Sequence, residues 1–170
     1  VYKSQIEVIK AYAALIEEGN FLPKLILAGS LTANTSYAKE VTDLITGYGL
    51  NQYIIAPGNI SYDLMPSLYK NSKFVIYASQ TENCPNILLE ALSCNCLILC
   101  SNLEPMPEFA KDSVIYFDPN DIGELKSKLR EIIRNEVDVE NIKQKIPDII
   151  KNFSWKDCAN STWDQISKLS

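Results

Sequence analysis

Two glutamates with seven residues between them are the side chains in this sequence best placed to do chemistry. They lie in the run SQTENCPNILLE, with Glu82 in a loop and Glu90 near the middle of a helix predicted over 86–93. Asn86 precedes Glu90 by four residues, so the two occupy one face of that helix. Carboxylates at these two places could accept hydrogen bonds from the hydroxyl groups of one ligand.

The start of the same helix is suited to an anion. The backbone amides of Asn86 and Ile87 are expected to be free there, at the positive end of the helix dipole. A nucleoside diphosphate sugar has a diphosphate for these amides and hydroxyl groups for both acids, so the spacing favours such a ligand. The spacing also allows a purely structural interpretation, in which Glu82 only stabilises the positive end of the helix dipole and Glu90 is a solvated helix residue.

Composition excludes several kinds of function. There is no histidine among the 170 residues, which removes imidazole-based catalysis. The net charge is -5, and a nucleic-acid partner is therefore not expected. The two arginines, Arg130 and Arg134, are expected to form a solvated helix face with Lys126 and Lys128. The sequence has neither a GxGxxG fingerprint after a strand nor a D-x-D pair that would hold a divalent metal.

The five cysteines are better explained as reduced thiols than as disulfides. Their number is odd, and Cys94, Cys96 and Cys100 fall in one short apolar stretch. Cys94 and Cys96 could form half of a metal site, but no histidine or second close pair accompanies them. The longest apolar stretch, over 87–100, is interrupted by polar residues and is shorter than the roughly 20 residues that a membrane span needs. We expect no metal and a cytoplasmic location.

Strands alternate with helices along most of the chain. Strands are predicted over 24–29, 53–56, 74–78, 96–100 and 114–117, and helices over 6–16, 36–48, 62–69, 86–93 and 107–110. This order predicts one α/β domain over residues 1–170, with a doubly wound, Rossmann-like parallel sheet. Beyond the sheet only helices are expected, over 121–135, 139–150 and 155–169. Trp155 and Trp163 share an apolar stripe on the last helix and are expected to pack in the core, unless part of the stripe meets another domain.

A doubly wound sheet binds its ligands beyond the carboxyl ends of its strands. The loops expected at that edge are Gly29-Ser30, 58–60, 78–86, 101–107 and 118–120. Gly29, Asn59 and Ile60 therefore join the candidate binding residues, with the loop over 78–86 as the most unusual segment.

The sequence around the two glutamates resembles a known family. The similar stretches are TENCPNILLEALSCNCLILCSN, EFA, YFDPNDIGELKSKLREII, LILAGS and the final FSW. They resemble the C-terminal domain of retaining glycosyltransferases of the GT-B fold, of the group 1 (family 4) type, over nearly the whole chain from Lys3. The resemblance implies transfer of a sugar from a nucleotide donor, with retention at the anomeric carbon and without a bound metal.

The resemblance also assigns roles to particular residues. Glu82 would contact hydroxyls of the donor sugar, Glu90 would bind the ribose hydroxyls, and the loop between them would supply amides to the diphosphate. Lys3 matches a lysine that neutralises the departing phosphate, and the backbone of Ile60 matches the position that pairs with the base. The leaving diphosphate is expected to help deprotonate the acceptor. The implied partners are a UDP- or GDP-sugar and a sugar or lipid-linked acceptor, which an N-terminal domain would bind.

The sequence departs from the family pattern at three places. Asn83, Cys84 and Pro85 stand where family members commonly have glycines, although Pro85 fits the first helical turn with Asn83 or Cys84 as its cap. The arginine that usually precedes the position of Lys3 is not among these 170 residues. The first strand and the N-terminal acceptor domain, which would also provide any membrane association, are expected to lie outside this sequence, leaving the fragment inactive. Two alternatives stay open, a non-catalytic scaffold that still binds a nucleotide sugar and a nucleotide-sugar epimerase.

Overall fold

The predicted alternation of strands and helices is present in the computed structural model, which describes residues 3–29 and 35–168. The strands are β1 (Leu25–Ala28), β2 (Ile54–Gly58), β3 (Val75–Tyr77), β4 (Ile98–Ser101) and β5 (Ile115–Phe117). The α-helices are α1 (Gln5–Glu17), α2 (Ser36–Gly47), α3 (Met65–Asn71), α4 (Asn86–Ser93), α5 (Met106–Ala110), α6 (Ile122–Ile133), α7 (Val139–Lys143), α8 (Ile146–Ile150) and α9 (Trp155–Ser167). Two 3-10 helices, η1 (Leu50–Gln52) and η2 (Tyr62–Leu64), precede β2 and α3.

Parallel pairing joins the strands into two groups. β1 pairs with β2, and Leu25 lies opposite Ile54. β4 lies between β3 and β5, with Leu99 opposite Ile115. The doubly wound α/β class is thus confirmed, but the strands do not form the one continuous sheet that was expected. Within the described part of the chain, no pairing connects β1 or β2 to β3.

A shared hydrophobic core holds the two sheets together. β4 is buried along its whole length, because Leu99 packs into one hydrophobic cluster and Ile98 and Cys100 pack into another. Residues from α1, α6 and the strands form one cluster that includes Tyr12, Leu15, Leu99, Phe117 and Leu129. Burying one such side chain contributes about 1.5–3 kcal/mol to the free energy of folding. This cluster therefore holds α1, and the residues at its start, against the strands.

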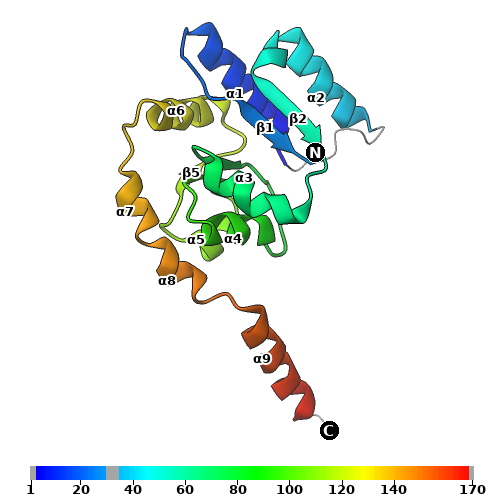
Figure 1. The fold of residues 1–170 in the computed structure, drawn as a ribbon, viewed down its shortest axis with the longest axis vertical. Coiled ribbons are helices and arrows are strands. Elements are labelled where there is room, and N and C mark those ends of the chain that lie inside the picture. Colours follow the sequence, from blue (N-terminus) through cyan, green and yellow to red (C-terminus); the bar gives the residue numbers. More distant parts are fainter. Residues whose placement is uncertain (1–2, 30–34, 169–170) are drawn as a thin grey trace.

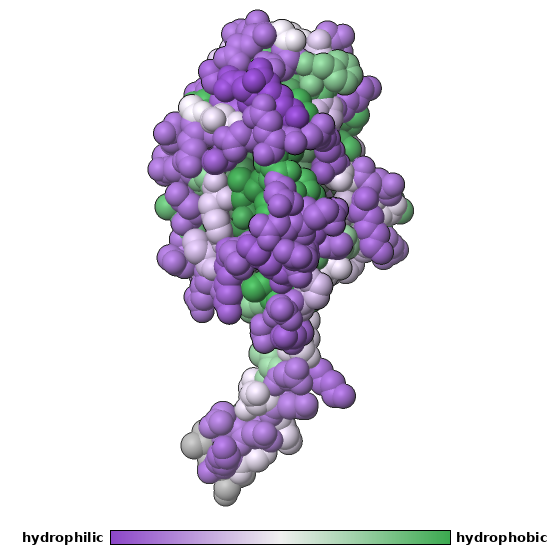
Figure 2. Space-filling model, turned by 90° about the vertical axis from the view of Figure 1, so that its left-hand side faces the viewer, coloured by the Kyte–Doolittle hydropathy of each residue, from purple (hydrophilic) through white to green (hydrophobic). Residues whose placement is uncertain are grey.

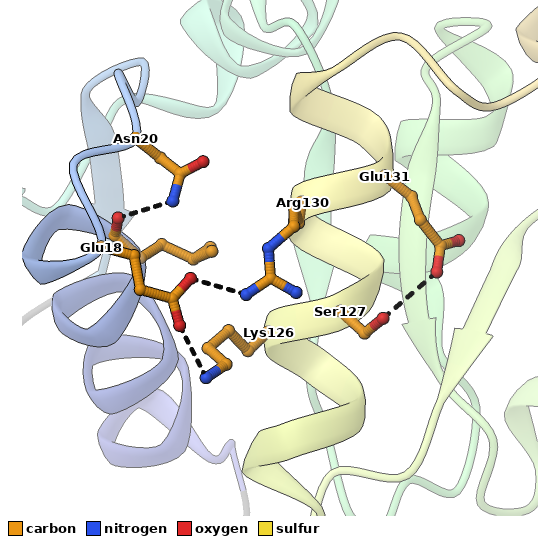
Figure 3. Close-up of polar contacts among 7 residues, drawn as sticks. Glu18, Asn20, Lys126, Ser127, Arg130 and Glu131 are labelled. Carbon is orange, nitrogen blue, oxygen red and sulfur yellow. Dashed lines mark hydrogen bonds and ion pairs between the residues drawn. The ribbon is translucent and has the colours of Figure 1, made fainter.

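Polar contacts also join α1 to α6 (Figure 3). Glu18, at the C-terminal end of α1, accepts hydrogen bonds from Lys126 at 3.0 Å and Arg130 at 2.6 Å. The hydrogen bond from Arg130, followed by that from Lys126, lowers the pKa of Glu18. Both contacts are exposed, so they are compatible with the predicted solvated basic face, and the end of α1 adds an acid beside two of its side chains.

The C-terminal helices differ most from the prediction. The helix expected over 139–150 is divided into α7 and α8, because Pro147 in the first turn of α8 has no amide to continue a helix. α9 extends away from the other elements (Figure 1), and Trp155 and Trp163 are 77% and 68% exposed. Packing of both tryptophans in the core is thus contradicted. Figure 2 shows the C-terminal extension at the bottom of the molecule. The face of the main body above it is mostly hydrophilic, and hydrophobic residues gather near the centre of that face.

Candidate functional site

Lys3 and Glu82 form an ion pair although 79 positions separate them in the sequence. Lys3 lies two residues before α1, and Ser4 between them has a left-handed backbone with φ 47°. Glu82 belongs to the loop that follows β3. Its side chain is 17% exposed and also accepts a hydrogen bond of 2.7 Å from the hydroxyl of Ser79. The structure therefore brings together the two residues to which a catalytic role was assigned.

The end of β3 supplies the remaining partners of this pair. Burial by itself would raise the pKa of Glu82, but hydrogen bonds from Lys3, Ser79 and Tyr77 outweigh it and lower the pKa below 4.5. The ammonium of Lys3 lies 5.6 Å from the centre of the Tyr77 ring. Glu82 is thus an ionised acid near neutral pH, held by donors from two elements.

The turn between Glu82 and α4 is built around Pro85. Pro85 is buried and has φ -80° and ψ 64°, close to an inverse γ-turn, in which a carbonyl accepts from the amide two residues on. The Asn86 amide donates to the Cys84 carbonyl at 2.8 Å in this way. The prediction of a free Asn86 amide is therefore wrong. The predicted capping by Asn83 or Cys84 is also wrong, because Pro85 itself is the N-cap and no side chain caps the helix.

Glu90 lies one turn into α4 and faces a cavity of about 910 Å³. Asn86 and Cys84 line the same cavity, as expected from the four-residue spacing of Asn86 and Glu90. Glu90 accepts a hydrogen bond of 3.1 Å from the hydroxyl of Tyr62 in η2, and this bond raises the pKa of Tyr62. Neither the sequence pattern nor the resemblance indicated Tyr62.

The remaining predicted residues lie at the carboxyl ends of β1 and β2. The Gly29 amide donates to the Gly58 carbonyl at 3.1 Å, and both glycines have positive φ, 120° and 79°. Asn59 is exposed and Ile60 is half-buried just after β2. Ser30, from the same predicted loop as Gly29, lies outside the described residues.

The predicted residues thus fall into three places. Lys3 and Glu82 form the ion pair, Cys84, Asn86 and Glu90 line the cavity, and Gly29, Asn59 and Ile60 follow the first two strands. Asn83 and Ile87 are exposed and, like Glu82, are not among the residues that line the cavity.

Residues 3–29 and 35–168 contain neither a metal-binding cluster nor a membrane-spanning helix. No cluster of three or more Cys, Asp and Glu residues in these ranges could hold a metal ion. No helix there is both long and apolar enough to cross a membrane.

Parallel strands alternating with helices define a Rossmann-like α/β domain. Residues 1–148 match the family described as glycosyl transferases group 1. The chain belongs to this family, and its fold is that of the C-terminal domain of GT-B glycosyltransferases.

Curated relatives are similar at low identity. The O-antigen chain mannosyltransferase B of Escherichia coli is 26% identical over 154 residues, which are 91% of this chain and 40% of the relative. The capsular polysaccharide biosynthesis glycosyltransferase CapH of Staphylococcus aureus is 27% identical over 114 residues, 65% of this chain and 31% of the relative. The chain therefore spans less than half the length of these relatives.

Solved structures share the fold. HepE of Anabaena in complex with UDP superposes with a TM-score of 0.83 and 20% identity, over 98% of this chain and 46% of HepE. A glycosyltransferase from Rickettsia africae gives a TM-score of 0.85 at 20% identity, over 100% of this chain and 46% of that protein.

Proposed function

We propose that this chain is the donor-binding domain of a retaining glycosyltransferase. The observation that carries the proposal is the ion pair of Lys3 with Glu82 in the loop that leads into α4, the helix that also bears Glu90. Lys3 comes to this loop from the start of α1, whereas Glu82 and Glu90 precede and follow the start of α4. Family membership over residues 1–148 supports the same function.

In this proposal each charged group meets one part of a nucleoside diphosphate sugar. Glu82 accepts hydrogen bonds from hydroxyls of the donor sugar, and Glu90 accepts them from the ribose. Lys3 is shared between Glu82 and the diphosphate, where its charge offsets the negative charge that develops on the leaving group. The amide of Ile87 and the positive end of α4 add to this effect, and the Ile60 backbone pairs with the base.

The proposed transfer needs no bound metal. The bond between the anomeric carbon and the diphosphate oxygen breaks, and the acceptor oxygen bonds to the same face of that carbon. The acceptor proton passes to the leaving diphosphate. Catalysis by this domain then consists mainly of stabilising the charge on the diphosphate.

The names of similar proteins support a nucleotide-sugar donor and a polysaccharide product. HepE binds UDP and UDP-glucose, and the relatives include an O-antigen mannosyltransferase and a capsular polysaccharide glycosyltransferase. We propose a UDP- or GDP-sugar as donor and a sugar or lipid-linked sugar as acceptor. Five free cysteines fit a cytoplasmic location, where thiols stay reduced.

We further propose that a strand and an acceptor domain outside residues 1–170 complete the protein. β1 pairs only with β2 and β3 only with β4 in the described chain, so each has one open edge. A strand preceding α1 would form a parallel βαβ unit with β1 and could fill the place between these edges. The exposed Trp155 and Trp163 of α9 fit a surface that the acceptor domain covers.

Hydrogen exchange in the full-length polypeptide tests this organisation. The amides of Leu25 and Val75 donate to the strands already paired, so those of Ile26 and Ile76 point to the open edges. We expect slow exchange of the Ile26 and Ile76 amides when the added strand is present. Exchange as fast as in the 170-residue chain would contradict the proposed strand.

Nucleotide titration tests the donor site itself. UDP, GDP and ADP are added in turn while backbone NMR shifts are recorded, and at least one should perturb residues 82–90. Glu90→Gln should weaken binding about tenfold, the effect of losing a hydrogen bond to a charged acceptor. Glu17→Gln, at an exposed acid of α1, is the matched control and should leave affinity unchanged. Absence of any perturbation at 82–90 with all three nucleotides would refute the donor site.

A non-catalytic nucleotide-sugar-binding scaffold is the second candidate, favoured by the turn at Pro85. Pro85 has no amide, and that of Asn86 is engaged with Cys84, so the loop offers fewer donors to a diphosphate. Turnover by the full-length polypeptide that disappears in Glu82→Ala would exclude the scaffold. Nucleotide binding without turnover by the full-length polypeptide would favour it.

A further inference from the structure

The ion pair of Lys3 and Glu82 engages two groups that the proposed donor also needs. Lys3 donates to Glu82 Oε1, and its ammonium lies 5.6 Å from the centre of the Tyr77 ring. The buried Ser79 hydroxyl donates to the same oxygen, Glu82 Oε1, at 2.7 Å. The positive charge of Lys3 is therefore already offset by a carboxylate that the loop after β3 holds in place.

The two partners differ in how well water reaches them. The side chain of Lys3 is 32% exposed, whereas that of Glu82 is 17% exposed. If Lys3 turned to a diphosphate, Glu82 would be left as a mostly buried carboxylate without its cation, which is costly unless another donor takes its place. A sugar hydroxyl is such a donor. The oxygens of an ionised diphosphate are not, because they accept hydrogen bonds.

We propose that Glu82 withholds Lys3 from a nucleotide that has no sugar, an inference that rests on the proposed donor site. A nucleotide sugar brings hydroxyls to Glu82, and Lys3 is then released to the diphosphate. After transfer the spent nucleoside diphosphate has no such hydroxyls, so Glu82 takes Lys3 back and the product is bound more weakly. The ion pair thus discriminates the donor from the product of the same reaction.

Isothermal titration calorimetry of the full-length polypeptide tests the inference, with whichever of UDP and GDP binds more tightly. Glu82→Gln keeps the size of the side chain and removes the charge that holds Lys3. Affinity for the sugar-free nucleotide should therefore rise about fivefold, the effect of releasing one partly exposed ion pair. An acid that contacted only the sugar would leave this affinity unchanged. Glu17→Gln removes an exposed acid of α1 and is the matched control, with no change expected.

A double-mutant cycle shows whether the gain acts through Lys3. In the Lys3→Met background no ammonium can be released, so Glu82→Gln should raise affinity by less than about twofold. Simple relief of repulsion between the carboxylate and the diphosphate would give the same gain with and without Lys3. A gain of equal size in both backgrounds would therefore overturn the inference.

A measurement on the parent protein needs no change at Glu82. The side-chain ¹⁵N signal of Lys3, assigned by its absence from Lys3→Met, should keep its position when UDP or GDP saturates the site. Movement of this signal would overturn the inference even if Glu82→Gln did not fold. If the parent protein binds a nucleotide and Glu82→Gln leaves its affinity unchanged or lowers it, only this inference fails. If the parent protein binds neither nucleotide, the proposed donor site fails as well.

Discussion

Replacing Ser79 by alanine should destabilise the protein in a way that depends on pH. Ser79 is 1% exposed, and its hydroxyl lies 2.7 Å from Glu82 Oε1 and 3.2 Å from the carbonyl of Thr81. The shorter contact is a hydrogen bond to an ionised acid, a type that contributes about 1.5–3 kcal/mol. We therefore expect Ser79→Ala to lower the free energy of unfolding by about 2 kcal/mol at pH 7.

The sign of the pH dependence follows from the pKa of Glu82, which is lower in the folded protein than its ordinary value of 4.5. A group with a depressed folded pKa stabilises the protein above its unfolded pKa, and this stabilisation is lost as the pH falls through the folded pKa. Ser79→Ala removes one of the donors that depress the pKa. The difference in the free energy of unfolding between variant and parent protein should therefore be largest at neutral pH and shrink below pH 4.5. The pKa of Glu82 should rise in the variant.

Urea unfolding at several pH values measures this effect. With a slope of about 2 kcal/mol per molar urea, the midpoint at pH 7 should fall by about 1 M. Ser93→Ala is the control, since the exposed Ser93 donates only to the Leu89 carbonyl of its own helix at 2.8 Å. The control should change stability by less than about 0.5 kcal/mol at every pH. A loss in Ser79→Ala that is the same at pH 7 and below the folded pKa of Glu82 would refute the reasoning.

Three further predictions concern the core, the thiols and the metal. Leu129→Ala should cost about 2–5 kcal/mol in urea unfolding, because Leu129 is fully buried in the cluster that joins α1 to α6; a cost below 1 kcal/mol would contradict that core. In the native protein, iodoacetamide should alkylate the exposed Cys84 and Cys158 but not Cys100, since burial raises the pKa of Cys100 to about 12; mass spectrometry of Cys100 peptides checks this. Sugar transfer by the full-length polypeptide should persist in EDTA, and activity that EDTA abolishes and Mg²⁺ restores would contradict the proposed metal-free reaction.

The local elements were predictable because they depend on nearby residues. The helix over 86–93 has the predicted bounds, and α6 directly follows Asp121, which caps it by accepting from the Glu124 amide at 3.0 Å. The prediction of one helix over 139–150 was wrong. It followed the apolar spacing and did not allow for Pro147, which divides the segment into α7 and α8.

The candidate site was predictable in part. The spacing of Asn86 and Glu90 predicted that they share a face, since this follows from helix geometry. The resemblance assigned roles to Lys3 and Glu82 but did not predict that they form an ion pair. Ser79 and Tyr62 were missed. The position of Ser79 in the loop just after β3, three residues before Glu82, was a usable signal for a partner of Glu82. Tyr62 had no such signal, because no periodicity relates η2 to α4.

The sequence by itself determined which segments are strands and helices, the α/β class and the acids most suited to a ligand with hydroxyl groups. Periodicity and capping act over a few residues, so a reader of the sequence can follow them. Only the tertiary structure decided that Lys3 neutralises Glu82, that Tyr62 contacts Glu90 and that the strands divide into two sheets. These contacts join residues 28 to 79 positions apart, and packing of α1 and α6 against the strands sets such distances, which no local pattern records.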